Sequence, residues 1–263
     1  EQLTPHMVRV VFGGEGLAGF PAGEFTDHYV KLMFLQDGVA YPEPFDMDAV
    51  RETLPRENWP RVRTYTVRSW DAESGELAID FVVHGDEGIA GPWAAAAKPG
   101  DSLLMMGPGG AYAPGEDADW HLLVGDEAAL PAIAASLERT PAGKPVYAFI
   151  EVAGAEEELK LTADADARVV WVHRGDRPVG EALVEAVQAL EFPDGAVHAF
   201  VHGEANFVKA LRTLLRVERG VEREQLSISG YWRRGRDEDG WQSSKSEWNA
   251  AVEAEEAAAM AAR

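Results

Sequence analysis

Arg63-Thr-Tyr-Thr-Val-Arg68 lies near the middle of the N-terminal half of the chain and indicates how that half folds. Its threonine, tyrosine and valine residues are typical of a β-strand. Further short β-rich runs, separated by turns that contain glycine or proline, lie at residues 7–12, 28–34, 76–84 and 102–106. Because no long helical pattern separates these runs, the N-terminal half is predicted to be an antiparallel β-barrel.

The C-terminal half alternates between strands and helices. Its expected strands lie at residues 120–124, 146–152, 168–172 and 197–202, and its expected helices at residues 128–139, 178–190 and 205–217. This alternation predicts a doubly wound parallel sheet. The chain should therefore have a two-domain β + α/β fold, followed by a C-terminal helical extension.

Proline, glycine and acidic residues cluster between Ala113 and Asp119, which favours a domain boundary there. We expect a β-barrel domain at residues 1–115, an α/β domain at residues 116–241 and a helical tail at residues 242–263. The tail is polar and rich in alanine and glutamate. Trp248 and Val252, four residues apart, are its expected apolar anchors.

Composition narrows the class of protein. The chain has 263 residues, of which 46% are hydrophobic, and this is enough for two globular domains. Its net charge of −21 disfavours binding to nucleic acids and to anionic membranes. The absence of cysteine excludes disulfides and cysteine-ligated metal sites. With no long apolar run and no signal-peptide pattern, we expect no membrane insertion and a cytoplasmic location.

The predicted strand at residues 63–66 carries the groups that a flavin cofactor needs. Arg63 can bind diphosphate oxygens in a bidentate manner. Tyr65 offers an aromatic surface for the flavin ring, and Thr66 offers a hydroxyl group near flavin N5. A strand that simply alternates polar and apolar residues would show the same pattern, so this alternative stays open.

A glycine-rich turn follows a later strand. His84-Gly85 leads into Gly88-Ile-Ala-Gly-Pro-Trp93, and a helix is expected at residues 94–97. Glycine lets a backbone approach a ligand closely, and the free N–H groups at a helix N-terminus bind anions such as a diphosphate. An ordinary loop before a helix is equally compatible with the pattern.

Ten short motifs follow one another in an order known from a larger family. They are Leu3-Thr-Pro-His-Met7, Asp27-His-Tyr-Val-Lys-Leu32, Arg63-Thr-Tyr-Thr-Val-Arg68, Asp80-Phe-Val-Val-His-Gly85, Trp93-Ala94, Pro99-Gly-Asp101, Gly107-Pro-Gly-Gly110, Gly125-Asp-Glu127, Leu130-Pro-Ala-Ile133 and Gly230-Tyr-Trp-Arg233. In layout the chain resembles the ferredoxin reductase superfamily, and in these motifs it resembles the siderophore-interacting protein family. The resemblance implies an FAD-binding barrel, an NAD(P)H-type domain and the reductive release of iron from ferric siderophores.

The resemblance also implies a set of FAD-binding residues, in which a C-terminal aromatic side chain covers the flavin. They are Arg63, Thr64, Tyr65, Thr66, Asp80, Val82, His84, Ala90, Gly91, Trp93, Tyr231 and Trp232. Two departures from the family pattern stand out. Many relatives have Gly-Pro-Ala-Ser where this chain has Gly88-Ile-Ala-Gly91, so backbone groups must replace one hydroxyl. Many also have a threonine where this chain has Ala128.

A nicotinamide site is expected beyond the first strand of the α/β half, at the edge where such sheets bind ligands. Its expected residues are Gly125, Asp126, Glu127, Leu130 and Glu151. Glu151 ends the next strand and is the expected partner of a ribose 2′-hydroxyl. Carboxylates here would repel a 2′-phosphate, so NADH is favoured over NADPH. A solvated acidic loop is the alternative interpretation.

Basic residues near the presumed flavin suggest a site for an anionic siderophore complex. Lys31 matches a family lysine in this role, and Arg233 and Arg234 begin a compact basic cluster that also includes Arg236. A surface lysine and salt bridges to neighbouring aspartates are the alternatives. The histidines show no metal-ligand spacing, and no serine-hydrolase motif occurs.

The expected function is the FAD-dependent reduction of a ferric siderophore, with electrons from NADH or NADPH. A nicotinamide gives two electrons and ferric iron takes one, and a flavin can convert between them. No protein acid or base is needed, so no catalytic side chain is predicted. The alternatives are a flavin reductase that serves a protein carrier or free flavin, and a binding module without turnover. The siderophore and the oligomeric state stay open.

Overall fold

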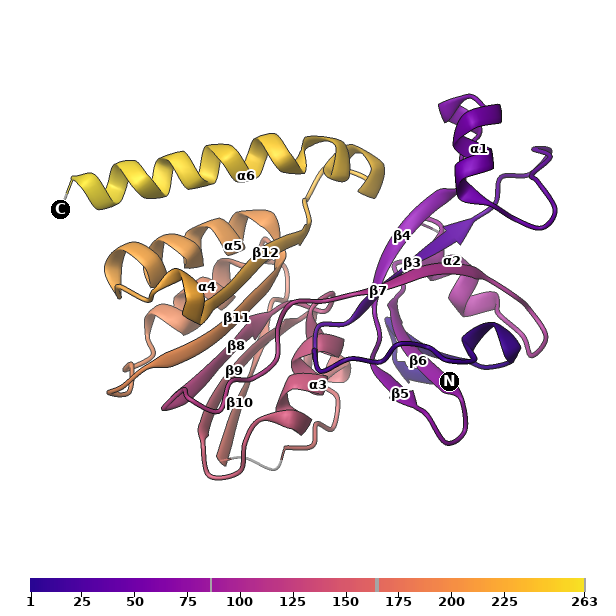
Figure 1. The fold of residues 1–263 in the computed structure, drawn as a ribbon. Coiled ribbons are helices and arrows are strands. Elements are labelled where there is room, and N and C mark those ends of the chain that lie inside the picture. The colour runs from indigo at the N-terminus through magenta and orange to yellow at the C-terminus, as the bar shows by residue number, and fades with distance from the viewer. Residues whose placement is uncertain (86, 164–165, 263) are drawn as a thin grey trace.

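The β-rich runs of the N-terminal half form two antiparallel sheets around one core, called the barrel lobe below (Figure 1). The structure, a computed structural model, describes residues 1–85, 87–163 and 166–262. One sheet has the order β1 (Gln2–Thr4), β2 (Met7–Phe12), β6 (Glu76–Val82) and β5 (Ser69–Asp71). The other has the order β4 (Arg61–Thr66), β3 (Tyr29–Phe34) and β7 (Leu104–Gly109). The predicted antiparallel barrel is thus confirmed.

Apolar side chains of both sheets fill this lobe. Val30, Leu32 and Ile79 are fully buried there. The helix α2 (Ala90–Ala96) packs on β2 and β6, and its Trp93 ring joins the same core. The connecting segments contain α1 (Met47–Thr53) and the short 3-10 turns η1 (Glu15–Leu17) and η2 (Arg56–Asn58).

The strands of the C-terminal half form one parallel sheet, called the α/β lobe. Its order is β10 (Asp166–His173), β9 (Pro145–Val152), β8 (Trp120–Gly125), β11 (Val197–Glu204) and β12 (Leu226–Trp232). The helix α3 (Leu130–Arg139) covers one face, and α4 (Glu181–Gln188) and α5 (Ala205–Arg212) cover the other (Figure 1). The doubly wound parallel sheet is confirmed. Short helical turns complete the lobe: η3 (Ala155–Glu157), η4 (Thr213–Glu218) and η5 (Arg223–Gln225).

Several element boundaries differ from the sequence prediction. The helix expected at residues 94–97 begins at Ala90, because the backbone of the glycine-rich turn already winds into it. The helix expected at residues 205–217 is α-helical only to Arg212 and continues as a π-helix in η4. Neither α1 nor β12 was predicted. The sequence of β12, Leu226 to Trp232, contains serine and glycine, which weaken a strand pattern.

The last helix, α6 (Glu238–Ala261), runs along the α/β lobe from the side of the barrel lobe (Figure 1). It begins earlier than the tail predicted at 242–263, because Asp237 caps it by accepting a hydrogen bond from the Gly240 N–H. Its main anchor is the buried Trp241 rather than Trp248, which is half-buried. Arg263 lies outside the described residues.

Ion pairs hold the rest of α6 on the α/β lobe. The pairs are Lys209–Glu255, Arg212–Glu256, Arg216–Glu256 and Arg223–Glu253. Val252 is buried as expected. None of the helices described for this chain has the length and apolarity needed to cross a membrane.

Candidate functional site

The strand order reverses between β8 and β11, and α/β sheets bind ligands at the carboxyl ends of strands where this happens. Gly125 ends β8 at this point. It has no room for a side chain, because a Cβ atom would lie 2.5 Å from the Ala129 Cβ and 2.7 Å from the His202 carbonyl oxygen. The chain therefore turns tightly from β8 toward α3 at the switch point of the sheet.

Asp126 follows Gly125 and is fully buried between the ends of three strands. Its carboxylate accepts hydrogen bonds from the Ala128 N–H at 3.0 Å and the Glu204 N–H at 2.9 Å. It also accepts one from the Trp232 indole Nε1 at 2.7 Å. These three donors occupy the carboxylate. The geometry thus supports a role in orienting Trp232 and does not support the predicted contact between Asp126 and NAD(P)H.

Glu204 is a second buried carboxylate beside Asp126. It caps α5 by accepting a hydrogen bond from the Asn206 N–H at 2.7 Å. It also accepts one from the Arg234 N–H at 3.1 Å. Together the two carboxylates fix the segment from Trp232 to Arg234, which contains residues predicted for both the flavin and the siderophore.

Asp126 should make stability depend on pH. Burial and the nearby charge of Glu127 raise its pKa to about 7 from an ordinary 3.8, although its hydrogen bonds oppose the shift. The folded state then holds this proton more tightly than the unfolded state. Stability is lost as pH rises from about 4 through 7. We expect the free energy of unfolding of Asp126→Asn to rise relative to wild type over this range, as urea titrations at several pH values would show. A pH-independent difference would contradict this assignment.

Arg174 follows β10 and reaches across the same edge of the sheet. Its guanidinium group donates to the Glu127 carboxylate at 2.9 and 3.2 Å and to Glu151 at 3.2 Å. Glu151 is fully buried and also accepts a hydrogen bond from the Gly180 N–H at 3.0 Å. Burial raises the pKa of Glu151, and these hydrogen bonds oppose the shift. Because its carboxylate is enclosed, the geometry does not support the predicted contact between Glu151 and a ribose.

The predicted flavin strand, β4, lies at the edge of its sheet. The Tyr65 ring packs on Phe81 with a centroid distance of 4.5 Å, and burial raises the pKa of its hydroxyl. The Arg63 side chain is only 12% exposed and donates to the Val62 carbonyl oxygen at 2.7 Å. Thr66 is buried at the end of the strand. Arg63 and Tyr65 thus lie on one strand, and their contacts restrict both side chains.

The first turn of α6 lies against β4. The Glu238 carboxylate accepts a hydrogen bond from the Thr64 N–H at 3.2 Å. The Asp239 carboxylate pairs with Arg61 at 3.2 Å and with Arg63 at 3.5 Å. Burial raises the pKa of Glu238, whereas its contacts with Thr64 and Arg63 lower it. A segment almost 180 residues away in sequence therefore contacts the predicted cofactor strand.

The end of β6 and the start of α2 lie close together. A Cβ atom on Gly91 would lie 3.0 Å from the Val82 carbonyl oxygen, so a larger residue would require the backbone at the end of β6 to shift by a few tenths of an ångström. Ala90, beside it, is buried. Asp80 is buried and forms a bidentate pair with Arg9 at 2.6 and 2.8 Å, which commits its carboxylate to the barrel itself. The pair does not support direct cofactor binding by the Asp80 carboxylate.

The remaining groups fit an FAD molecule in their chemistry. Arg63 offers a cation for a diphosphate, and Tyr65 offers aromatic surface beside the edge of β4. The glycine-lined start of α2 brings backbone groups close to the end of β6. Trp93 packs on Phe81 and Phe12 with centroid distances of 6.1 and 6.0 Å, so its ring lies in the barrel core, and its contact with FAD stays a prediction.

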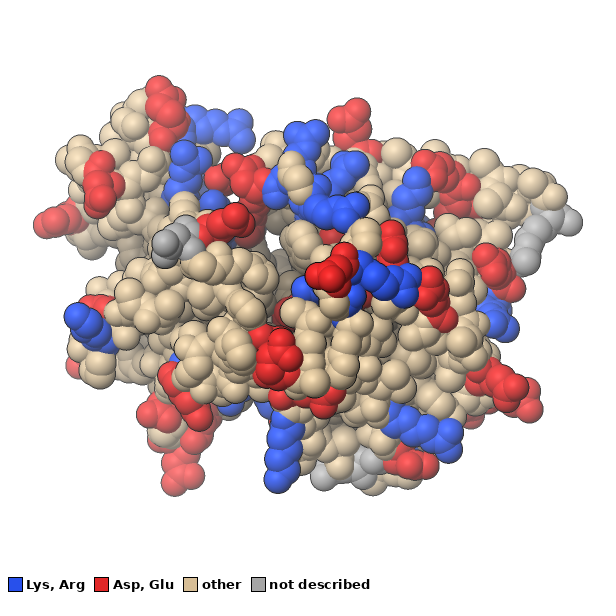
Figure 2. Space-filling view, turned by 180° about the vertical axis from the view of Figure 1, so that it is seen from behind, with Lys and Arg blue, Asp and Glu red and all other residues tan. Residues whose placement is uncertain are grey.

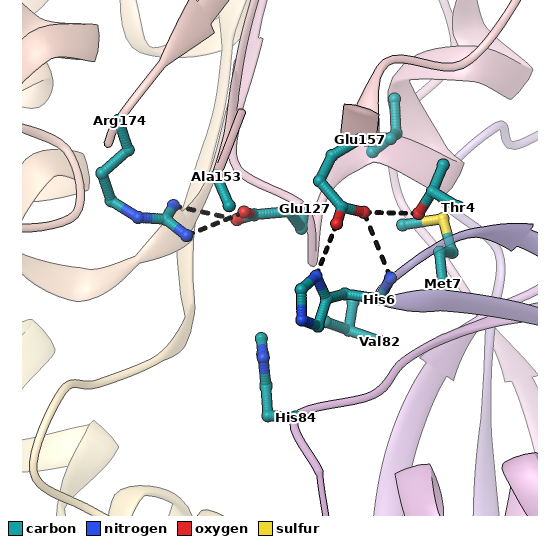
Figure 3. Close-up of a pocket in the computed structure, with 10 residues that line it drawn as sticks. Thr4, His6, Met7, Val82, His84, Glu127, Ala153, Glu157 and Arg174 are labelled. Carbon is teal, nitrogen blue, oxygen red and sulfur yellow. Dashed lines mark hydrogen bonds and ion pairs between the residues drawn. The ribbon is translucent and has the colours of Figure 1, made fainter. Parts of the chain in front are cut away.

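A pocket of about 140 Å³ lies where the two lobes meet (Figure 3). Val82 and His84 line it from the barrel lobe, and Glu127 and Leu130 line it from the α/β lobe. His84 points into the space between the Arg174–Glu127 pair and His6 (Figure 3). The fold thus brings residues predicted for FAD and residues predicted for NAD(P)H to the walls of one pocket.

Glu157 joins the lobes beside this pocket. Its buried carboxylate accepts hydrogen bonds from the Thr4 hydroxyl and from the His6 N–H, and it also pairs with the His6 ring (Figure 3). Burial pushes the pKa of Glu157 up, but these contacts outweigh it and lower the pKa. The pairing fixes the turn between β1 and β2 against η3, and so fixes one wall of the pocket.

The predicted siderophore residues lie on the outer surface. Lys31 is exposed on β3, directly opposite Thr64 of β4 in the strand register. Arg233 is half-buried, and Arg234 is exposed. Figure 2 shows that, on the face it displays, basic side chains are interspersed with acidic ones rather than forming one large basic area. Any attraction of an anion is therefore local.

Comparisons with known proteins agree with this architecture. Residues 1–112 match the family model described as siderophore-interacting FAD-binding domain, and residues 118–235 match that described as siderophore-interacting protein. The chain belongs to the siderophore-interacting protein family. Its predicted membership is confirmed.

Three similar proteins illustrate the match. The chain is 35% identical over 241 residues to the ferric vibriobactin reductase ViuB of Vibrio cholerae, covering 91% of this chain and 88% of that one. It is 31% identical over 242 residues to the NADPH-dependent ferric-chelate reductase of Escherichia coli, covering 88% and 89%. The crystal structure of the siderophore-interacting protein SipS from Aeromonas hydrophila superposes with a TM-score of 0.80 at 30% identity, covering 95% and 94%.

Sequence reasoning missed four polar residues of this siderophore-interacting protein's site. Arg174 could have been found, because it follows a parallel strand at the same sheet edge as Gly125. Glu204 follows the same rule for β11. The contact between His6 and Glu157 could not be found from local patterns, because it joins residues 151 positions apart.

Proposed function

We propose that this siderophore-interacting protein uses FAD to reduce ferric siderophores, with electrons from a nicotinamide donor. Reduction releases the metal, because siderophores bind iron(II) far more weakly than iron(III). The printed names of two relatives, a ferric vibriobactin reductase and a ferric-chelate reductase, support this reaction class. The match to an FAD-binding domain supports the cofactor.

The pocket between the lobes is the single observation that carries the proposal. Its walls combine Val82 and His84, at and just after the end of β6 in the barrel lobe, with Glu127 and Leu130 at the switch point of the parallel sheet. A hydride donor and its acceptor must come within about 3–3.5 Å of each other. A pocket with one wall from each predicted cofactor site supports such an approach.

The chain's own residues would bind FAD and orient its ring. FAD, when bound, supplies a carrier that takes two electrons and passes them on singly. Arg63 would hold its diphosphate, and Tyr65 would lie beside its ring. Asp126 keeps Trp232 at the carboxyl edge of the sheet, where an aromatic cover for the flavin is proposed. No side chain has to move a proton for electron transfer to iron.

The electrostatics of the sheet edge favour NADH over NADPH. Arg174 lies there, but its guanidinium group already pairs with two carboxylates. Glu156 is exposed nearby, and Glu158 pairs with His173 at 2.8 Å. A 2′-phosphate would meet these carboxylates, and like charges repel. The proposed preference for NADH therefore rests on Arg174, whose guanidinium group is already paired, and on the carboxylates of Glu156 and Glu158. It does not rest on Glu151.

An anionic ferric siderophore would approach from the side of Lys31. This lysine is exposed and lies beside Thr64 of the flavin strand. Arg233 and Arg234 extend from the segment that Glu204 holds in place. A basic group beside a flavin gives an anionic complex a local attraction against the overall charge of −21.

The test is a reduction assay on the purified protein. We expect FAD to copurify, and we expect iron(II) to be captured by a colorimetric chelator when NADH and a ferric siderophore are supplied. The value of kcat/KM should be higher with NADH than with NADPH. Oxidation of NADH without iron(II) formation would favour a flavin reductase, and binding without oxidation would favour a binding module. A preference for NADPH would contradict the argument from Arg174.

A further inference from the structure

The first turn of α6 contacts the two groups of β4 that an FAD diphosphate would use. Asp239 pairs with Arg63, the proposed diphosphate ligand, and with Arg61. Glu238 accepts the hydrogen bond of the Thr64 N–H, a backbone donor on the same strand. The Asp239 carboxylate is thus bound by a guanidinium group, and the Glu238 carboxylate by a backbone N–H. Both kinds of donor are also typical ligands of phosphate oxygens.

A diphosphate and these carboxylates would compete for the same donors. The Arg63 side chain is 12% exposed, so its guanidinium group has restricted freedom to turn toward a second anion. Its donors already reach the Val62 carbonyl oxygen and both oxygens of Asp239. A diphosphate bound to Arg63 would also lie near two carboxylates of like charge, and this repulsion would weaken its binding.

The helix α6 can stay in place when the side chains of Glu238 and Asp239 leave β4. Trp241 is buried beside Gly230, where a Cβ atom would lie 3.0 Å from the indole ring. Farther along, Glu253, Glu255 and Glu256 form ion pairs with the α/β lobe. These contacts do not involve Glu238 or Asp239, so the two acidic side chains can turn away from β4 while Trp241 stays buried.

We propose that the acidic first turn of α6 is an internal competitor of FAD, in which Glu238 and Asp239 take the place of the cofactor's diphosphate on Arg63 and Thr64. This inference rests on the proposed function, which assigns FAD to β4. Loading of FAD then requires the Glu238 and Asp239 side chains to withdraw from β4. The C-terminal helix thereby sets the affinity of the barrel lobe for its cofactor.

The experiment measures FAD binding to the flavin-free protein by fluorescence titration at low salt. Asp239→Asn and Glu238→Gln each remove one charge while keeping the shape of the side chain. We expect each to lower the Kd for FAD about three- to tenfold, and the double variant to lower it further. The gain should shrink at 1 M salt, because exposed charges are screened there. Glu247→Gln is the matched control, since Glu247 is exposed on the same helix.

Riboflavin separates charge competition from simple covering of the strand. It carries the flavin ring without phosphate, so its Kd should be the same for wild type and Asp239→Asn. An equal gain for riboflavin, an equal gain from Glu247→Gln, or an unchanged or weaker affinity for FAD in both α6 variants would overturn the inference. Each of these results leaves the flavin assignment intact. Failure of every protein, wild type included, to bind FAD would overturn the proposed function as well.

Discussion

Arg63→Ala is expected to lower the affinity for FAD about 30- to 1,000-fold, equivalent to about 2–4 kcal/mol. The substitution removes the proposed charge-assisted contact with the diphosphate. It also leaves Asp239 paired with Arg61 alone, so that the repulsion of the diphosphate by Glu238 and Asp239 is offset less. The measurements are the FAD content after gel filtration and the Kd from titration of the flavin-free protein.

Arg61→Ala is the matched control for Arg63→Ala. Arg61 is on the same strand and also pairs with Asp239, but its side chain is 48% exposed. Loss of this screened charge should change the Kd for FAD only a few-fold. Equal losses in the two variants would mean that the charge of the strand matters, and that Arg63 makes no specific contact with the cofactor.

Gly125→Ala should destabilise the protein by about 2–4 kcal/mol and disrupt the switch point of the sheet. A methyl group there would lie 2.5 Å from the Ala129 Cβ and 2.7 Å from the His202 carbonyl oxygen. Both neighbours belong to rigid elements, so β8, α3 or β11 would have to shift. The free energy of unfolding in urea measures the effect.

Gly16→Ala provides the comparison for Gly125→Ala. A Cβ atom on Gly16 has no heavy atom within 4 Å, and its backbone does not need the left-handed region. Its free energy of unfolding should change by less than about 0.5 kcal/mol. If Gly125→Ala were as mild as Gly16→Ala, the turn would be far more compliant than its packing indicates.

Local patterns were enough to predict the fold. Most strands of both lobes follow from their β-rich or apolar runs, and the alternation of strands and helices after Trp120 predicted the parallel sheet. The missed strand β12 contains Ser227 and Ser229, whose partners lie on β11 far back in sequence. The early start of α6 was missed because Trp241 has its packing partner at Gly230, outside the helix.

The candidate site was less predictable than the fold. Residue types singled out Glu127 and Leu130, which line the pocket, and their predicted contact with NAD(P)H stays a prediction. They did not show which carboxylates are already occupied. Asp126 and Glu151 were predicted to lie at the NAD(P)H site, Glu151 as the partner of a ribose hydroxyl, and the structure pairs their carboxylates with Trp232 and Arg174. Such pairings join distant parts of the chain, and composition and spacing carry no information on them.

The position of β10 at the edge of the sheet has a consequence for how the molecules behave when crowded. Its eight residues present an outer row of backbone groups that no strand of the described structure pairs with, and its Val170 is exposed. Such an edge is a template for strand addition and aggregation. Asp166 and Arg168 place charges along it.

Two copies that approach edge to edge also bring together two bodies of charge −21. That repulsion acts over about 8 Å at physiological salt, which is farther than the spacing of about 4.8 Å between paired strands. The acidity of the chain therefore opposes the association before backbone hydrogen bonds can form.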